Sequence, residues 1–407
     1  MDLSEVDIID PSRWAAGIPH SEFEMLRAVA PVFWHEMPGH RGFYAVTKYE
    51  DVVAISRNPK LFSSARGGTN LEDYEEEDLS QIQLLMVNMD PPLHGKYRKL
   101  ISKGFTPKMT RRMAPRVSQT VADILDKVSG MARCDFVREV AAELPLVVIA
   151  DLMGIPQEDR ALVYDWSNRL IGFDDPEFQT SLEDARVAAF EIWMYANDLA
   201  ESRRGTPGTD LTRVLMNAMV DGEELTEMEF DAFFLMLAVA GNETTRNAIS
   251  GGLLALLENP DQLALLRENV DDEALMNSAV EEIIRWVTPV VHFRRTVTED
   301  TVLRGVSLKE NDKVAIFYTS ANRDEEVFEN ASQFDITRSH NPHIAFGVGA
   351  HFCLGASLAR LEIRILLEQL VKRLPEIRLD GPVRRLRSNF INGIKELPVS
   401  LTPQQES

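Results

Sequence analysis

One cysteine near the C-terminal end of the chain stands in a setting that suits a metal ligand. Cys353 lies in the segment 345–356, with Gly347 and Gly349 before it and Gly355 after it. Glycine permits backbone conformations, including positive φ, that bulkier residues resist. Apolar residues then recur at intervals of three and four, which predicts a helix that begins just after the cysteine. The N–H groups and dipole of a helix start favour a thiolate, so this segment could hold iron through an anionic sulfur.

The same segment could instead hold a buried structural cysteine or form a dinucleotide-binding loop. A cysteine among apolar residues is usually an inert buried thiol, but simple packing requires neither three glycines nor the aromatic Phe352 directly before Cys353. A dinucleotide-binding loop would need a third glycine where Phe352 stands. The pattern therefore favours a metal-binding thiolate over either alternative.

A second candidate centre is an acid next to an alcohol in a long predicted helix over 225–257. Gly241 is a poor helix former, and the Thr244 hydroxyl can divert a backbone carbonyl, so we expect a local opening of the helix here. The Glu243 carboxylate could collect protons from water and the Thr244 hydroxyl could relay them to a bound oxygen species. A helix kink with a surface glutamate is the alternative.

Two pairs of residues at helical spacing suggest ionic roles. His94 and Arg98 are four residues apart in a helix predicted after two prolines, so they share one face. Buried anionic groups need such paired donors, although an ordinary exposed pair has the same spacing. Glu282 and Arg285, three apart, are positioned for an ion pair.

The run Phe346-x-x-Gly349-x-His351-x-Cys353-x-Gly355 resembles the haem-binding signature of the cytochrome P450 family. The resemblance extends over nearly the whole length. It implies a mainly α fold, with a long central helix over the haem and small β-sheets, in a single domain over residues 1–407. It also implies haem b (iron protoporphyrin IX), held through its iron by the Cys353 thiolate.

The resemblance assigns roles to further positions of this chain. It implies that Thr244 and Glu243 manage protons, in a motif where many members carry Asp instead of Glu. The implied haem-binding residues are His94, Arg98, Arg295 and His351 at the propionates, with Phe346, Gly347 and Ala240 around the ring. The implied substrate pocket comprises Met236, Val239, Val291, Phe293 and Ile391. The implied structural set behind the haem comprises Glu282, Arg285 and Arg338.

Composition limits the class of protein. Lys and Arg total 43 against 64 Asp and Glu, a formal net charge of −21, which makes nucleic-acid binding unlikely. The two cysteines, Cys134 and Cys353, argue against a disulfide framework and for a reducing compartment. The acidic N-terminus has no apolar signal, and no uncharged run approaches the ~20 residues of a membrane span. We therefore expect a soluble cytoplasmic protein.

Residues 91–122 contain no acidic side chain but several basic ones. In so acidic a chain this suggests a docking face for an acidic, ferredoxin-type electron donor, with a solvated basic helix as the alternative. The expected reaction is O2-dependent hydroxylation of an unactivated C–H bond, with two electrons from NAD(P)H through ferredoxin. The apolar pocket indicates a hydrophobic small molecule, and the run 241–247 resembles bacterial members that oxidise sterol side chains, branched lipids and terpenoids. A peroxide-driven haem oxidase and a non-catalytic haem-binding sensor remain alternatives.

Overall fold

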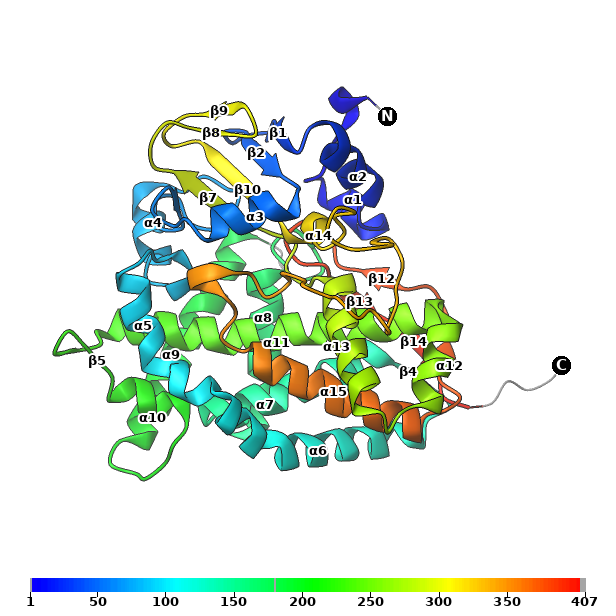
Figure 1. The fold of residues 1–407 in the computed structure, drawn as a ribbon. Coiled ribbons are helices and arrows are strands. Elements are labelled where there is room, and N and C mark those ends of the chain that lie inside the picture. Colours follow the sequence, from blue (N-terminus) through cyan, green and yellow to red (C-terminus); the bar gives the residue numbers. More distant parts are fainter. Residues whose placement is uncertain (1, 179–180, 403–407) are drawn as a thin grey trace.

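A large helical part and a smaller part rich in strands make up the molecule (Figure 1). The computed structural model describes residues 2–178 and 181–402. Within these ranges no helix combines the length and the apolar character needed to cross a bilayer. The helices are α1 Pro11–Ala16, α2 His20–Val29, α3 Tyr49–Ser56, α4 Glu76–Ile82, α5 Leu93–Ser102, α6 Pro107–Ser129, α7 Glu143–Met153, α8 Arg160–Ile171, α9 Leu182–Arg203, α10 Leu211–Met216, α11 Glu227–Glu258, α12 Pro260–Glu268, α13 Glu273–Val287, α14 Tyr318–Ala321 and α15 Ala356–Arg373.

The long helix α11 crosses the middle of the helical part, with α7, α8, α9, α13 and α15 packed against it (Figure 1). A capping box begins it: the Thr226 hydroxyl accepts from the Glu229 N–H (3.3 Å), and the Glu229 carboxylate accepts from the Thr226 N–H (2.8 Å). Because α11 is apolar on nearly every side, it is stable only when other helices surround it. The helix predicted over 225–257 is thus confirmed.

The largest sheet has the strand order β1-β2-β10-β7-β3 and lies beside α3, above α11 in Figure 1. Strands β2 and β10 pair in parallel, and the other neighbours are antiparallel. Strand β7 carries Arg295, one of the haem-binding residues that the sequence suggests. The strands are β1 Val32–His35, β2 Phe43–Val46, β3 Phe62–Ser63, β4 Arg133–Asp135, β5 Met219–Val220, β6 Glu223–Glu224, β7 His292–Val297, β8 Thr301–Leu303, β9 Val306–Leu308, β10 Lys313–Phe317, β11 Arg378–Leu379, β12 Arg384–Arg385, β13 Ile394–Glu396 and β14 Pro398–Ser400.

Helix α15 anchors the cysteine segment to the core. It starts three residues after Cys353 and packs against α6, α13 and α11. Leu358, Ile363, Leu366 and Leu370 of α15 join one apolar cluster with α6, α11 and α13. The mainly α fold with a long central helix and small sheets is therefore confirmed.

A buried acid on α15 gives a prediction for stability against pH. Glu362 is 3% exposed and its Oε2 has no hydrogen-bond partner among the described residues. Burial raises its pKa from 4.5 to about 8. Because the folded state then binds a proton that the unfolded state releases, stability falls as pH rises from about 4.5 to about 8.

Glu362→Gln should therefore stabilise the protein increasingly as pH rises through that window, since the amide cannot ionise. Thermal midpoints of parent and variant, taken at pH 5, 6.5 and 8, measure the difference. A difference that stays constant across the three pH values would show that Glu362 does not titrate in this way.

Candidate active site

The cysteine segment is a tight loop that its own backbone closes. The Cys353 N–H donates to the Phe346 carbonyl (2.8 Å), and the Gly347 N–H donates to the Ile344 carbonyl (2.8 Å). Gly347 and Gly349 have φ of +68° and +79°, in the left-handed region that favours glycine. A Cβ at Gly349 would lie 2.6 Å from the Ser56 carbonyl oxygen. Glycine at 349 is thus needed both for conformation and for the close approach of α3.

Gly349→Ala should destabilise the protein, because the added methyl meets backbone and the left-handed conformation costs about 1–3 kcal/mol for a residue with a side chain. Gly130→Ala is a matched control, since a Cβ there meets nothing within 4 Å. Thermal midpoints of the two variants provide the comparison. Equal midpoints would mean that the loop relaxes without cost.

The Cys353 thiol points at the start of α15. Burial raises the pKa of this thiol, while the N–H groups of Gly355 and Ala356 and the charges of Arg98 and Arg360 act in the opposite direction. The residue nevertheless keeps accessible surface. A sulfur that is deep in the fold, open on one side and faced by positive groups suits a thiolate ligand of a metal.

Two arginines and two histidines gather beside this loop, and Asp90 is the acid that acts on His94 and Arg295. The rings of His94 on α5 and His351 lie 4.1 Å apart, centroid to centroid. Within the described ranges, neither Arg98 nor Arg295 has a carboxylate oxygen within 4.0 Å, although Arg295 is only 4% exposed. Burial and the neighbouring Arg295, His94 and Arg98 lower the pKa of His351 to about 2.

This cluster needs an anion, because buried positive charge is costly without a partner. The two carboxylates of haem would meet that need, so the residues present fit the group. The structure brings together all four of the propionate partners inferred from the sequence, and they come from three separate segments of the chain.

One face of α11 stays accessible in the middle of an otherwise buried helix. Met236, Ala240 and Thr244 follow one another at intervals of four, and each retains exposed surface. The Thr244 hydroxyl donates to the Ala240 carbonyl (3.0 Å). The predicted local opening is not present, since α11 runs unbroken through Gly241. Gly241 instead permits close packing, because a Cβ there would lie 3.0 Å from Cδ1 of Ile149.

Glu243 turns to a different side of α11 from Thr244. It is 1% exposed, it forms an ion pair with Arg246, and its Oε1 accepts from Nδ2 of Asn247 (2.9 Å). Arg246 in turn donates to Oδ1 of Asn168 on α8 (2.9 Å) and lies over the Tyr164 ring. The carboxylate is therefore held by a buried cation rather than placed in water. Arg246 was missed in the sequence, although its spacing of three from Glu243 was the available signal.

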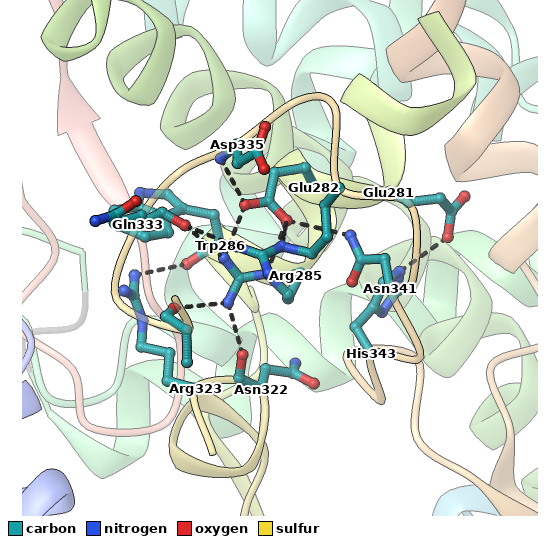
Figure 2. Close-up of polar contacts among 12 residues, drawn as sticks. Glu281, Glu282, Arg285, Trp286, Asn322, Arg323, Gln333, Asp335, Asn341 and His343 are labelled. Atoms are coloured by element: carbon teal, nitrogen blue, oxygen red, sulfur yellow. Dashed lines mark hydrogen bonds and ion pairs between the residues drawn. The ribbon is translucent and has the colours of Figure 1, made fainter. Parts of the chain in front are cut away.

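A buried ionic network holds the chain behind the cysteine loop (Figure 2). The Glu282 carboxylate accepts from Arg285 Nε (2.7 Å) and from Arg338 Nε (3.1 Å). Arg285, which is 0% exposed, also donates to the carbonyls of Asn322 (2.8 Å) and Ala331 (2.9 Å). The three residues inferred as a structural set thus lie together, and they tie α13 to the segment that leads to Cys353.

Arg360 was not among the sequence-based candidates. Its Nε and Nη2 donate to Glu281 on α13 (2.6 and 2.8 Å), and its guanidinium lies over the Phe346 ring, 4.6 Å from the centroid. Arg360 therefore links α15, α13 and the cysteine loop.

The pocket candidates differ in accessibility. Met236 and Phe293 retain exposed surface, whereas Val239 is 9% exposed. Val291 and Ile391 are packed in the core at 0% and 2%, where the Val291 N–H donates to the Phe390 carbonyl (2.9 Å). Of the five pocket candidates, Met236 and Phe293 therefore retain the most accessible surface.

Comparison with known proteins identifies the family. The family model described as Cytochrome P450 matches residues 11–377. This chain belongs to the cytochrome P450 family. A steroid C26-monooxygenase of Rhodococcus jostii is 43% identical over 97% of this chain and 84% of its own length. A methyl-branched lipid omega-hydroxylase of Mycobacterium bovis is 41% identical over 98% of this chain and 95% of its own length.

Solved cytochrome P450 structures superpose closely on this one. The Mycobacterium marinum cytochrome P450 CYP268A2, in complex with pseudoionone, has a TM-score of 0.91 and 38% identity over 97% of this chain and 98% of its own. CYP109E1 from Bacillus megaterium, in complex with testosterone, has a TM-score of 0.84 and 33% identity over 94% of this chain and 98% of its own. Like other cytochrome P450s, this protein is a haem-dependent monooxygenase.

Proposed function

We propose that this cytochrome P450 hydroxylates the terminal methyl group of a steroid side chain or of a methyl-branched lipid. The main support is that two groups of relatives, each about 40% identical over nearly the whole chain, are named for oxidation at C26 of a steroid and at the omega end of a branched lipid. Both positions are chain ends, so a slender pocket over the haem would serve either substrate. The apolar Met236 and Phe293 suit such a chain. Terpenoids share this branched, apolar character and remain candidate substrates.

In this proposal Cys353 would hold the haem iron, and His94, Arg98, Arg295 and His351 would hold the propionates. Bound haem supplies the activation of O2 that C–H hydroxylation requires. Thr244 offers a hydroxyl on the accessible face of α11 that can hold and pass on a proton. Glu243 would take part in proton delivery only when its contact with Arg246 loosens, since that contact now occupies Oε1 of the carboxylate.

We also infer that two electrons from NAD(P)H arrive through a ferredoxin-type donor at a basic face formed by α5 and α6. Five cationic side chains there are exposed and have no carboxylate within 4.0 Å among the described residues: Lys99, Lys103, Lys108, Arg111 and Arg112. Helix α6 packs against α15, which begins beside Cys353. A negatively charged donor would be attracted to this face.

We infer that residues 1–407 form one domain, because segments near the N-terminus and near the C-terminus contact each other. The Asn389 side chain donates to the Ile9 carbonyl (2.6 Å), and Arg387 donates to the Ser12 hydroxyl (3.2 Å).

The test is turnover by the haem-loaded protein with NADPH, a surrogate ferredoxin and its reductase. The substrates are cholest-4-en-3-one, a methyl-branched fatty acid and a linear fatty acid of equal length. We expect the first two to give a terminal alcohol, identified by mass spectrometry, and the linear acid to give little. Hydroxylation away from the chain end, or none with either branched substrate, would refute the proposal. Product formed equally well with peroxide alone would favour a peroxide-driven oxidase.

Two variants examine the proton relay in the same assay. Thr244→Ala should lower the fraction of consumed NADPH that appears as product, because the hydroxyl on the accessible face is lost. Thr244→Ser keeps the hydroxyl and should stay close to the parent. Unchanged coupling in Thr244→Ala would remove Thr244 from the relay.

A further inference from the structure

A cavity separate from the haem site lies between the N-terminal and C-terminal parts of the chain. Its volume is about 420 Å³, within the range of small-molecule sites. Its walls come from α2, the second half of α11, the end of α13, the segment after α14 and the hairpin of β12 and β13. None of the residues assigned above to haem, oxygen or substrate lines it.

Two arginines in the wall of this cavity form no ion pair in the described part of the chain. Arg323 is 7% exposed, its guanidinium lies 3.7 Å from the centroid of the Trp286 ring, and Nη2 makes one long hydrogen bond to the Trp286 carbonyl (3.4 Å). Figure 2 shows this arginine beside Trp286. Arg385 on β12 reaches only Oδ1 of Asn392, at 3.5 Å. Within the described ranges, neither guanidinium has a carboxylate within 4.0 Å.

A third arginine in the cavity wall differs from these two because it has an acidic partner. Arg27 of α2 also lines the cavity, but its Nε donates to Glu325 Oε2 (3.0 Å), so its charge is neutralised. Burial and the nearby Arg323, Arg27 and Arg385 hold the pKa of His20 well below its usual range. Burial also lowers the pKa of Arg323 to about 9. Arg27 is thus neutralised by Glu325, whereas Arg323 and Arg385 are not held in an ion pair within the described ranges.

Two further acids line the cavity, and Glu258 is close enough to act on the charge of Arg385. Glu24 and Glu258 line the cavity but are exposed and make no ion pair within the described ranges. Apolar surface from Leu254, Val287 and Ile394 completes the wall. Arg323, which is nine-tenths buried, and the half-buried Arg385 therefore stand in the wall of a partly apolar cavity without an ion pair among the described residues.

We propose that this cavity binds a small organic oxyanion, a phosphate or a carboxylate, through Arg323 and Arg385. Guanidinium groups bind such anions with two parallel hydrogen bonds. The apolar part of the ligand would lie along Leu254, Val287 and Ile394, next to Trp286. The site does not depend on the substrate proposed above, because it shares no residue with the haem side of the molecule.

The experiment is isothermal titration of the haem-loaded protein with phenyl phosphate, benzoate, inorganic phosphate and phenol at constant ionic strength. Phenyl phosphate or benzoate should bind more tightly than inorganic phosphate, and phenol should not bind at the cavity. Tighter binding of phenyl phosphate would indicate a phosphate ligand, and tighter binding of benzoate would indicate a carboxylate ligand. Absence of binding by phenyl phosphate, benzoate and inorganic phosphate would overturn the proposal.

Variants locate the binding. Arg323→Gln and Arg385→Gln should each weaken it by at least about tenfold, as expected for loss of a hydrogen bond to a charged group. Glu258→Gln at the rim should strengthen it. Arg138→Gln, at an exposed arginine outside the cavity, is the control and should bind as the parent does. Arg385→Gln lies at a half-buried position, so the test stands even if Arg323→Gln does not fold. Equal affinity in the parent and both cavity variants would contradict the assignment.

Discussion

Cys353→Ser should abolish hydroxylation, with a loss of more than about a hundredfold, because changes outside the ligand shell of a metal alone cost 10–100-fold. A serine hydroxyl stays protonated near neutral pH and cannot replace an anionic sulfur. The loop itself should persist, since it is closed by the backbone hydrogen bond from Cys353 N–H to Phe346 and not by the side chain. The reduced, CO-bound parent should show the red-shifted Soret band of thiolate ligation, and the variant should lack it.

The chain provides its own control for this experiment. Cys134 lies half-buried on β4, and burial raises the pKa of its thiol to about 11, so it is no thiolate near neutral pH. Cys134→Ser should retain the red-shifted band and most of the activity. If Cys353→Ser hydroxylated its substrate at the parent rate, thiolate ligation by this residue would be refuted.

Glu282→Ala should produce the largest loss of stability among the substitutions considered. Both Glu282 and Arg285 are 0% exposed, and Glu282 also accepts hydrogen bonds from Arg338, Asn341 and the backbone of Asp335. Removing the carboxylate leaves buried guanidinium charge without a partner, which costs about 3–5 kcal/mol. Urea denaturation followed by far-UV circular dichroism measures the change, and the Soret absorbance reports loss of haem in the same titration.

Glu368→Ala is the matched control, because Glu368 pairs with Lys372 on the exposed side of α15 (3.2 Å). Exposed ion pairs contribute little, so its midpoint should stay near that of the parent. A Glu282→Ala protein that unfolds at the same urea concentration as this control would show that the network is dispensable.

The cysteine loop illustrates what local sequence can predict. Glycine at 347 and 349 is required by positive φ, and Cys353 precedes a helix that begins at Ala356. These features depend on neighbours along the chain, so they can be inferred from residue type and spacing. The long helix predicted over 225–257 is found at Glu227–Glu258. It too could be inferred from the sequence, because one apolar run and its capping residues define it.

Glu243 illustrates the opposite case. The sequence predicts an acid beside Thr244 but not the side of α11 that the carboxylate occupies. Its orientation depends on Arg246, which Asn168 and Tyr164 of α8 hold in place. The burial of Val291 and Ile391 is likewise the result of packing between distant segments. Helical spacing alone carries no information about which neighbouring helix covers a given face.

The amino-acid sequence by itself indicated the family, a cysteine whose setting suits a metal ligand, and the helices around it, because each depends on patterns within one short segment. Only the tertiary structure decided which charges are neutralised. Arg27 pairs with Glu325 and Arg285 pairs with Glu282. Arg323 and Arg385 form no ion pair in the described part of the chain. Partners for a buried charge come from segments far apart in the sequence, so the unpaired pair, and the site that we infer from it, becomes visible only after folding.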